Sequence, residues 1–199
     1  MKRIFRKQSG FTLIEIVTAL AISGILFAAA ATAFSAFFSK YEELTKVSDL
    51  EAQAFDCLQK GIKYGLVMSE GTNERVWYGV SNADSVSFFN GSANGASGII
   101  LTTQALDVSH MNDYVKFWYD GKSVRGSYLH GTLSPSAPIY IFPKQGRNNK
   151  ITVTNLRFKQ INPSTPAKVL QVDLSAKVEI RKNVFRYVNY STKMAINKL

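Results

Sequence analysis

The feature that most constrains the fold is an uncharged stretch of 23 residues, 16–38. At about 1.5 Å rise per residue a helix of this length measures roughly 34 Å, enough to cross a hydrocarbon core of about 30 Å. Basic residues precede it, at Lys2, Arg3, Arg6 and Lys7. Because positive flanks stay cytoplasmic, the sequence predicts a membrane-spanning helix with the C-terminal bulk outside the cytoplasm.

A cleaved secretory signal peptide is the first alternative. Its apolar region is about 7–15 residues long, and the run here is longer. A plain membrane anchor fits the length but leaves Glu15 unexplained. A carboxylate at the edge of an apolar segment is costly and indicates a functional residue with a partner.

The residues around Glu15 carry a family resemblance. "KQSG" followed by "FTLIE" (residues 7–15) resembles the signal of type IV pilins and type II secretion pseudopilins. In that family a prepilin peptidase cuts after the glycine and methylates the new N-terminal amine. The resemblance implies cleavage between Gly10 and Phe11 and N-methylation of Phe11. It also places Glu15 at the position where the family has a glutamate.

A physical role for Glu15 follows from this cleavage. The new amine of Phe11 would lie in a medium of low dielectric, where the Glu15 carboxylate of an axially staggered neighbour could neutralise it. Desolvation offsets much of the attraction, so we expect the pair to select register more than to add stability. The implied partners are the prepilin peptidase, other pilin or pseudopilin subunits and the inner membrane.

One departure from the family concerns proline. Many major pilins have a proline in the second half of this segment, whereas this chain has Thr32 there and no proline in the apolar run. Gly24 does match a glycine of the family. The missing proline favours a minor subunit over a main fibre subunit.

The apolar helix is predicted to continue outward as an amphipathic helix. Apolar residues recur at spacings of three and four: Leu44, Val47, Leu50, Ala54, Leu58 and Ile62. Gly61 and Gly65 mark its end. We expect one helix from residue 11 to about residue 64, its first half in the membrane and its second half packed on a globular head.

After Gly65 the pattern changes to short strand-like runs. They cover residues 75–80, 85–89, 98–103, 114–119, 123–129, 139–142, 151–160, 169–178 and 184–188. Asp120-Gly121 predicts a tight turn and residues 90–98 a flexible loop. Residues 170–180, "LQVDLSAKVEI", alternate over part of their length and predict a half-exposed strand. The predicted fold is α+β and pilin-like, a long helix packed on an antiparallel sheet, similar in size and strand number to J-type minor pseudopilins.

Three segments follow from this organisation. Residues 1–10 are the cleaved basic leader, residues 11–39 the transmembrane and fibre-core helix, and residues 40–199 the periplasmic or otherwise extracytoplasmic head with the second half of the helix.

Catalytic and metal-binding patterns are not found. His110 and His130 have no partner at metal-ligand spacing, and Asp107 and Asp113 are isolated. The single cysteine, Cys57, permits no intrachain disulfide and is read as an apolar helix residue. We therefore expect no enzyme activity, no metal and no cofactor.

Nucleic acid is a further candidate partner, because the chain has a net charge of +10. Aromatic and basic residues alternate over 114–130, with Lys116, Lys122 and Arg125, and cationic residues recur near the C-terminus at Arg181, Lys182, Arg186 and Lys193. The favoured interpretation of the first cluster is a hairpin with its aromatic rings inward and its charges outward.

These observations predict a structural minor pseudopilin, assembled into a secretion pseudopilus or its tip complex. The alternative is a minor type IV pilin for competence, DNA uptake or adhesion.

Overall fold

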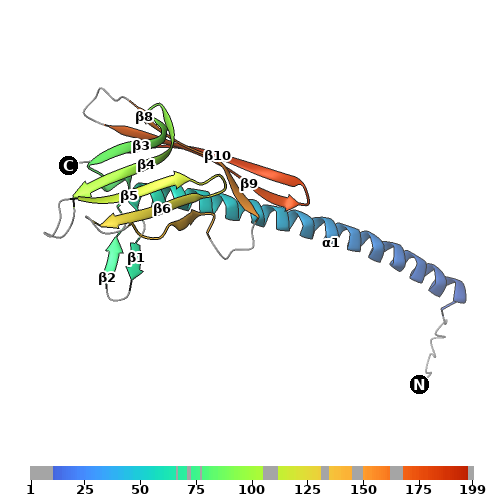
Figure 1. Ribbon diagram of the computed structural model, residues 1–199. Helices are drawn as coiled ribbons and strands as arrows, with labels where there is room; N and C mark the ends of the chain where they lie inside the picture. The colour runs from blue at the N-terminus through green and yellow to red at the C-terminus, as the bar shows by residue number, and fades with distance from the viewer. Residues whose placement is uncertain are drawn as a thin grey trace, which may run out of the picture. The chain divides into compact units, whose positions relative to one another are not determined.

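The computed structural model describes residues 11–65, 67–70, 73–76, 78–104, 112–130, 135–144, 150–161 and 168–196 (Figure 1). The chain divides into two compact units, an N-terminal unit (Met1–Leu44) and a C-terminal unit (Thr45–Leu199). Helix α1 (Leu13–Asp56) contributes residues to both units and continues without a break into η1 (Cys57–Tyr64), a π-helix. The predicted long helix ending near residue 64 is confirmed.

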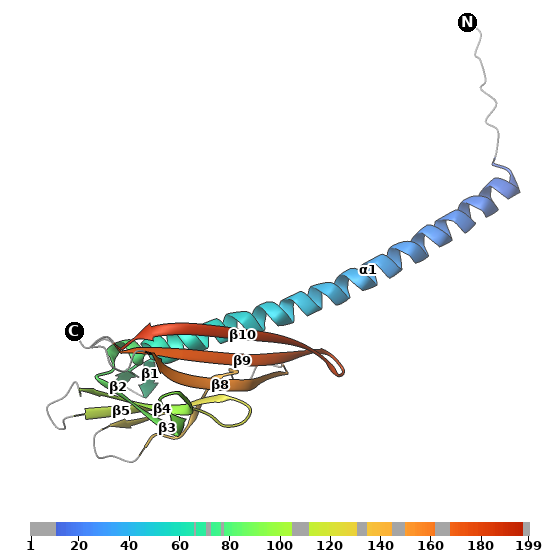
Figure 2. The same cartoon turned by 90° about the horizontal axis from the view of Figure 1, so that it is seen from above.

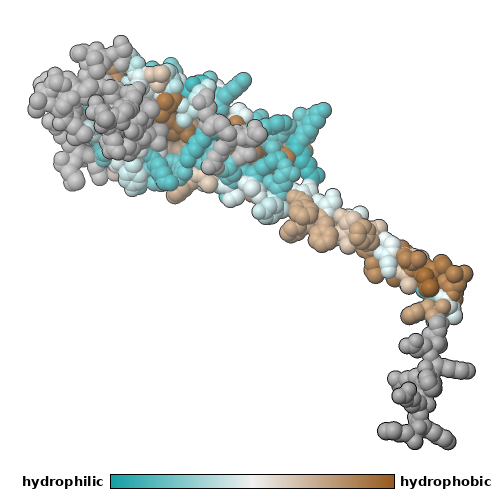
Figure 3. All heavy atoms as spheres, turned by 90° about the horizontal axis from the view of Figure 1, so that it is seen from below, coloured by the Kyte–Doolittle hydropathy of each residue, from teal (hydrophilic) through white to brown (hydrophobic). Residues whose placement is uncertain are grey.

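In the N-terminal unit, every side chain from residue 11 to residue 38 is exposed. The residues from Leu13 to Tyr64 form a helix that is long and apolar enough to cross a membrane, with a mean hydropathy of 2.2 over its most apolar window. Figure 3 shows the apolar residues along this part of the chain in brown. An apolar helix with no buried side chain requires lipid or other helices to cover it.

In the C-terminal unit, the rest of the helix buries one face. Leu50, Ala54, Leu58 and Ile62 are at most 3% exposed and belong to the hydrophobic core. This is the predicted apolar stripe, with one correction: Leu44 is 67% exposed, so the buried face begins C-terminal to it.

The strands of the C-terminal unit are all antiparallel. They are β1 (Val67–Glu70), β2 (Asn73–Val76), β3 (Ser85–Ser92), β4 (Gly95–Gln104), β5 (Asn112–Tyr119), β6 (Val124–His130), β7 (Ile139–Phe142), β8 (Ile151–Ile161), β9 (Val169–Arg181) and β10 (Val184–Ala195). Strands β1 and β2 form a hairpin of their own, and η2 (Val80–Asn82) is a short 3-10 turn. The combination of helix and antiparallel sheet confirms the predicted α+β, pilin-like fold.

The larger sheet has the order β10-β9-β8-β4-β5-β6-β7, and β3 pairs with β4. Strands β8 to β10 form one ribbon and strands β3 to β7 form another. The two ribbons meet where Ala96 of β4 pairs with Phe158 of β8. Figure 2 shows β8, β9 and β10 side by side. Residues from the helix and from both ribbons join one core, which includes Phe117, Phe142 and Phe158.

Strand β9 shows how the sequence pattern determines the buried face. Alternate residues from Leu170 to Ile180 are buried, and the residues between them are partly exposed. This is the period of two that a strand with one covered face requires. The prediction of a half-exposed strand is confirmed.

Two local predictions were wrong, and one strand was not predicted. Residues 90–98 are not a loop, because β3 and β4 extend into them and leave a tight turn at Ala93 and Asn94. The backbone N–H of Gln160 on β8 donates to the carbonyl of Ala93 at 2.8 Å, which anchors this turn to the neighbouring ribbon. The strand expected at residues 75–80 is shifted to β2, since Val80 begins η2, and β1 was not predicted.

The two glycines read as helix ends have different roles. Gly65 ends the helix with a φ of 85°, a conformation that favours glycine. Gly61 lies inside η1, and a Cβ there would come within 2.8 Å of Cγ2 of Ile141 on β7. Gly61 therefore permits close packing between helix and strand.

Candidate functional site

The start of α1 holds the candidate residues of the N-terminal unit. The Glu15 Oε2 atom accepts hydrogen bonds from the backbone N–H and the hydroxyl of Thr12, each at 2.8 Å, and the backbone N–H of Glu15 donates to Thr12 Oγ1 at 3.3 Å. This reciprocal arrangement is a capping box, Thr-x-x-Glu. Thr12 and Glu15 thus satisfy polar groups that a helix otherwise leaves open at its first turn.

Of the two residues at the expected cleavage site, the structure describes Phe11. Phe11 is 84% exposed and directly precedes Thr12, whereas Gly10 lies outside the described residues. Phe11 stands four residues before Glu15 in the chain and just ahead of the helix start at Leu13, so the expected new N-terminus and the carboxylate belong to the same short segment.

Hydroxyl groups farther along the apolar segment are bonded to their own helix. Thr18 Oγ1 donates to the carbonyl of Ile14 at 2.9 Å, and Thr32 Oγ1 donates to the carbonyl of Ala29 at 2.8 Å. Such internal bonds let threonine lie in an apolar environment. Helix α1 runs through Thr32 without interruption.

The C-terminal unit offers a second candidate site on the outer face of β3 to β7. Directly opposed residues of an antiparallel pair point to the same face. The register therefore places one row of side chains across five strands: Phe89, Gly98, Trp118, Arg125 and Tyr140. The next row contains Ser87, Ile100, Lys116 and Ser127.

Cations and rings alternate along these rows. The Lys116 ammonium lies 4.2 Å from the ring centroid of Phe89 and 5.4 Å from that of Trp118. The Arg125 guanidinium lies 3.4 Å from the ring centroid of Tyr140. These are cation–π distances, so the rings fix the positions of both cations.

The expected hairpin with inward rings is therefore only partly correct. Phe117 and Tyr128 are buried, in agreement with it. Tyr114 and Trp118 instead lie on the outer face with Lys116, where all three line a pocket. The prediction was wrong for these two rings because the strand alternation places them with Lys116 and opposite to Val115 and Phe117.

The turn between β5 and β6 is fixed by Asp120. Its Oδ1 accepts from the backbone N–H groups of Lys122 and Ser123, at 3.0 and 2.7 Å, and its Oδ2 accepts from Ser123 Oγ at 2.8 Å and Arg125 Nε at 2.6 Å. Burial opposes ionisation of Asp120, but these donors outweigh it and lower its pKa to about 2. The predicted tight turn is confirmed, with Gly121 at a φ of 98°.

The second basic cluster is not brought together. Arg186 and Lys193 lie on β10 at an odd separation, so they point to opposite faces of the strand. Arg181 ends β9 and Lys182 lies in the turn that follows. Arg186 and Lys193 therefore do not share a face of the strand.

The comparisons with known proteins identify the N-terminal segment. Residues 5–31 match the family model described as the prokaryotic N-terminal methylation motif. The chain carries the type IV pilin and pseudopilin signal. A search of curated proteins and a search of solved structures find no match.

The pilin signal and the capping box share two residues, Thr12 and Glu15. From the sequence, the partner of the Glu15 carboxylate was expected on a neighbouring subunit. Its hydrogen bonds to Thr12 of the same helix start were not predicted. The signal that could have revealed this was the Thr-x-x-Glu spacing before an apolar run, a known helix start.

Asp113 and Cys57 are the remaining candidate residues whose side chains the structure describes, and both are buried in the C-terminal unit. Asp113 is 2% exposed and its Oδ2 accepts a hydrogen bond from the Tyr128 hydroxyl at 2.7 Å. Burial raises the pKa of the Cys57 thiol, which lies in the core. His110 and Asp107 lie outside the described residues, and for His130 the structure describes only its backbone, in β6. Within the described part of the chain, no group of three or more His, Cys, Asp or Glu side chains could hold a metal ion.

Proposed function

We propose that the chain is a minor pseudopilin, inserted in the inner membrane, processed after Gly10 and assembled into a secretion pseudopilus or its tip complex. The match of residues 5–31 to the methylation motif carries this proposal. The motif implies a structural pilin-type subunit that is cut by prepilin peptidase and assembles with other subunits. In this proposal residues 1–10 are the leader, 11–39 the fibre-core helix and 40–199 the extracytoplasmic head.

The minor role in secretion is favoured by the unbroken helix. The apolar segment has no proline, and α1 runs through Thr32 without interruption. Many main fibre subunits of the family have a helix-weakening proline in this part of the segment. A minor type IV pilin remains the alternative, and the identity of the co-purified subunits separates the two. Secretion-system pseudopilins in cross-linked complexes would support the proposal, and pilus or DNA-uptake subunits would replace it.

Processing is tested on the full chain expressed with a prepilin peptidase. Mass spectrometry of the N-terminus should find a chain that begins at Phe11 and carries one methyl group on its amine. Gly10→Leu should block cleavage, because the peptidase requires a small residue, while Ser9→Ala should be processed normally. A correctly trimmed Gly10→Leu chain would contradict the proposed site.

The role of Glu15 requires a test that separates assembly from helix capping, since the structure shows a capping box. Glutamine can fill the glutamate position of a capping box but carries no charge. Glu15→Gln should therefore preserve the helix start and still lose assembly, if the carboxylate neutralises the amine of a neighbouring Phe11. Thr12→Ala removes the cap, at a cost of about 1 kcal/mol, and keeps the charge.

The expected result is that Glu15→Gln and Glu15→Ala both insert into the membrane and both fail to enter the filament. Thr12→Ala should assemble at a reduced yield. Normal assembly of Glu15→Gln, together with failure of Thr12→Ala, would show that Glu15 acts as a helix cap and not as a charge partner.

A further inference from the structure

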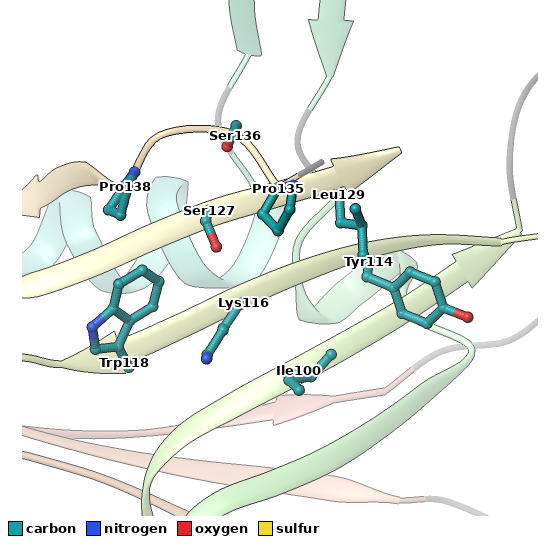
Figure 4. A pocket seen from close by; sticks show the side chains of 9 residues that line it. All are labelled: Ile100, Tyr114, Lys116, Trp118, Ser127, Leu129, Pro135, Ser136 and Pro138. Atoms are coloured by element: carbon teal, nitrogen blue, oxygen red, sulfur yellow. The ribbon is translucent and has the colours of Figure 1, made fainter. Parts of the chain in front are cut away.

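A pocket of about 500 Å³ opens on the outer face of β4, β5 and β6 (Figure 4). Its lining includes Ile100, Tyr114, Lys116, Trp118 and Leu129, together with residues of the segment 135–138. The volume lies in the range of about 300–1,000 Å³ that is typical of sites for small molecules. A site of this size fits a compact ligand rather than an extended chain.

The floor of the pocket is unusually apolar for the outer face of a sheet. Trp118, Tyr114, Ile100 and Leu129 are all partly exposed there. The core on the other face is closed without them, since Val115 and Phe117 are fully buried. Apolar surface that the fold leaves uncovered in a concave site indicates binding. Figure 4 shows the Trp118 and Tyr114 rings on either side of Lys116, which spaces two flat apolar surfaces around one cation.

The segment 135–138 forms one wall, and β6 holds it in place. The backbone N–H of Ser136 donates to the carbonyl of Tyr128 at 2.7 Å. The backbone N–H of Tyr128 donates in return to Ser136 Oγ at 2.9 Å. These two bonds fix the wall before any ligand arrives, and a preformed site lowers the cost of binding.

Lys116 gives the pocket its charge. The described residues that line it include one lysine and no carboxylate. The Lys116 ammonium lies against the rings of Phe89 and Trp118, and these contacts hold it at the edge of the apolar floor. A cation surrounded by apolar side chains attracts an anion more strongly than one surrounded by water. The Arg125 guanidinium nearby is paired with Asp120 and adds little net charge.

We propose that this pocket binds a small molecule that combines a flat apolar body with a single anionic group. The apolar body packs on Trp118 and Tyr114, and the anion pairs with the Lys116 ammonium. The two parts are required together, because the rings select shape and the lysine selects charge. This binding role is separate from assembly through the N-terminal helix and does not depend on it.

The test uses 2-naphthoate and 2-naphthamide, two probes of nearly the same shape that differ in charge. Each is titrated calorimetrically into the full chain in detergent micelles, with empty micelles as the reference. One equivalent of 2-naphthoate should bind, about tenfold more tightly than 2-naphthamide, because only the acid can pair with Lys116.

Three variants locate the site. Lys116→Met keeps an unbranched apolar side chain and should lower the affinity for naphthoate to that for naphthamide, with the affinity for naphthamide unchanged. Trp118→Ala should weaken both probes by about fivefold or more, because both lose the stacking surface. The matched control, Lys159→Met, removes an exposed lysine on β8 and should change neither affinity.

Several outcomes would overturn the proposal. They are equal affinities of the wild-type chain for the two probes, no binding of either, or an unchanged affinity for naphthoate in Lys116→Met. As a control for folding, Lys116→Met should unfold at the same temperature as the wild-type chain. Displacement of naphthoate by oligothymidylate at much lower concentration than by thymidine monophosphate would also overturn it, in favour of single-stranded nucleic acid.

Discussion

Residues 11–38 and the C-terminal unit are both rich in apolar side chains, and they use them in opposite ways. In the first, every side chain is exposed, including Phe27 at 79%. In the second, Phe117, Phe142 and Phe158 are fully buried in one core. Apolar content alone therefore does not show whether the side chains of a segment are buried within the same chain. The first region needs lipid or other helices, and the second covers its own apolar surface.

The polar groups of the two regions differ in the same way. In the N-terminal segment Thr12, Glu15, Thr18 and Thr32 bond to residues three or four positions away. In the C-terminal unit the Lys46 ammonium donates to the carbonyl of Ile180, 134 positions along the chain. The Lys144 backbone N–H similarly donates to Gln53 Oε1. Local bonds hold one region together, and long-range bonds hold the other.

The largest expected difference between the two regions is in the cost of removing an aromatic ring. Phe117→Ala should lower the free energy of unfolding of the C-terminal unit by about 3–5 kcal/mol, because it removes a fully buried ring and leaves a cavity. Phe27→Ala should change it by less than about 0.5 kcal/mol. Urea unfolding of the full chain in detergent, followed by near-ultraviolet circular dichroism, measures both.

The expected difference between the two regions is contradicted if Phe27→Ala destabilises the C-terminal unit as much as Phe117→Ala does. That result would mean that the exposed helix supports the core energetically. The conservative variant Phe117→Leu keeps most of the buried volume and should lose less stability than Phe117→Ala.

A smaller effect is expected from Asp120, which lies in the C-terminal unit but accepts hydrogen bonds from residues at most five positions away in the chain. Its folded pKa of about 2 is below the ordinary value near 3.8, so the unfolded chain binds more protons between these pH values. This contribution is present above pH 4 and is lost as the pH falls toward 2. Because Asp120 lies on an exposed turn, solvent screening reduces it to about 1 kcal/mol or less.

The measurement is the difference in unfolding free energy between the wild-type chain and Asp120→Asn at several pH values. The difference should be largest above pH 4 and shrink toward pH 2. Arg125→Gln removes one donor and keeps the turn bonds, so its effect should be intermediate. A difference that does not vary with pH would show that the carboxylate acts through shape and not through charge.

The contrast between local and long-range bonds also explains what the sequence could predict. The helix, its end at Gly65, the Asp120 turn and the alternation of β9 all depend on spacing within a few residues, and all were predicted. The tight turn at residues 93 and 94 was not, because it is anchored by Gln160 on a distant strand. Glycine-rich composition predicts a loop when no distant partner is known.

The candidate sites follow the same rule. The pilin signal is a contiguous motif, and residues 5–31 could be read from the sequence alone. The pocket around Lys116 depends on the register of three strands and on the segment 135–138. The alternation of Tyr114, Lys116 and Trp118 placed them on one face, but only the packing of Val115 and Phe117 shows that this face is the outer one.

The smallest expected effect distinguishes two glycines on the same continuous helix. Gly61→Ala brings a Cβ within 2.8 Å of Cγ2 of Ile141, while an added Cβ at Gly24 has no atom within 4 Å among the described residues. Crowding costs about 1–3 kcal/mol, and the helix propensity of alanine returns about 1 kcal/mol. Gly61→Ala should thus lower the unfolding free energy by about 1 kcal/mol, and Gly24→Ala should leave it unchanged.

Ile141→Leu provides the control for this pair, because leucine has no Cγ2 methyl group on its Cβ. In that background Gly61→Ala should cost less than in the wild-type chain, as measured by urea unfolding. An equal cost in both backgrounds would show that the loss comes from the π-helical backbone.

If Gly24→Ala leaves unfolding unchanged but reduces filament yield, the space beside Gly24 serves a neighbouring helix, since small residues let apolar helices approach closely. The absence of both effects would mean that this glycine has no packing role in the single chain or in the assembly.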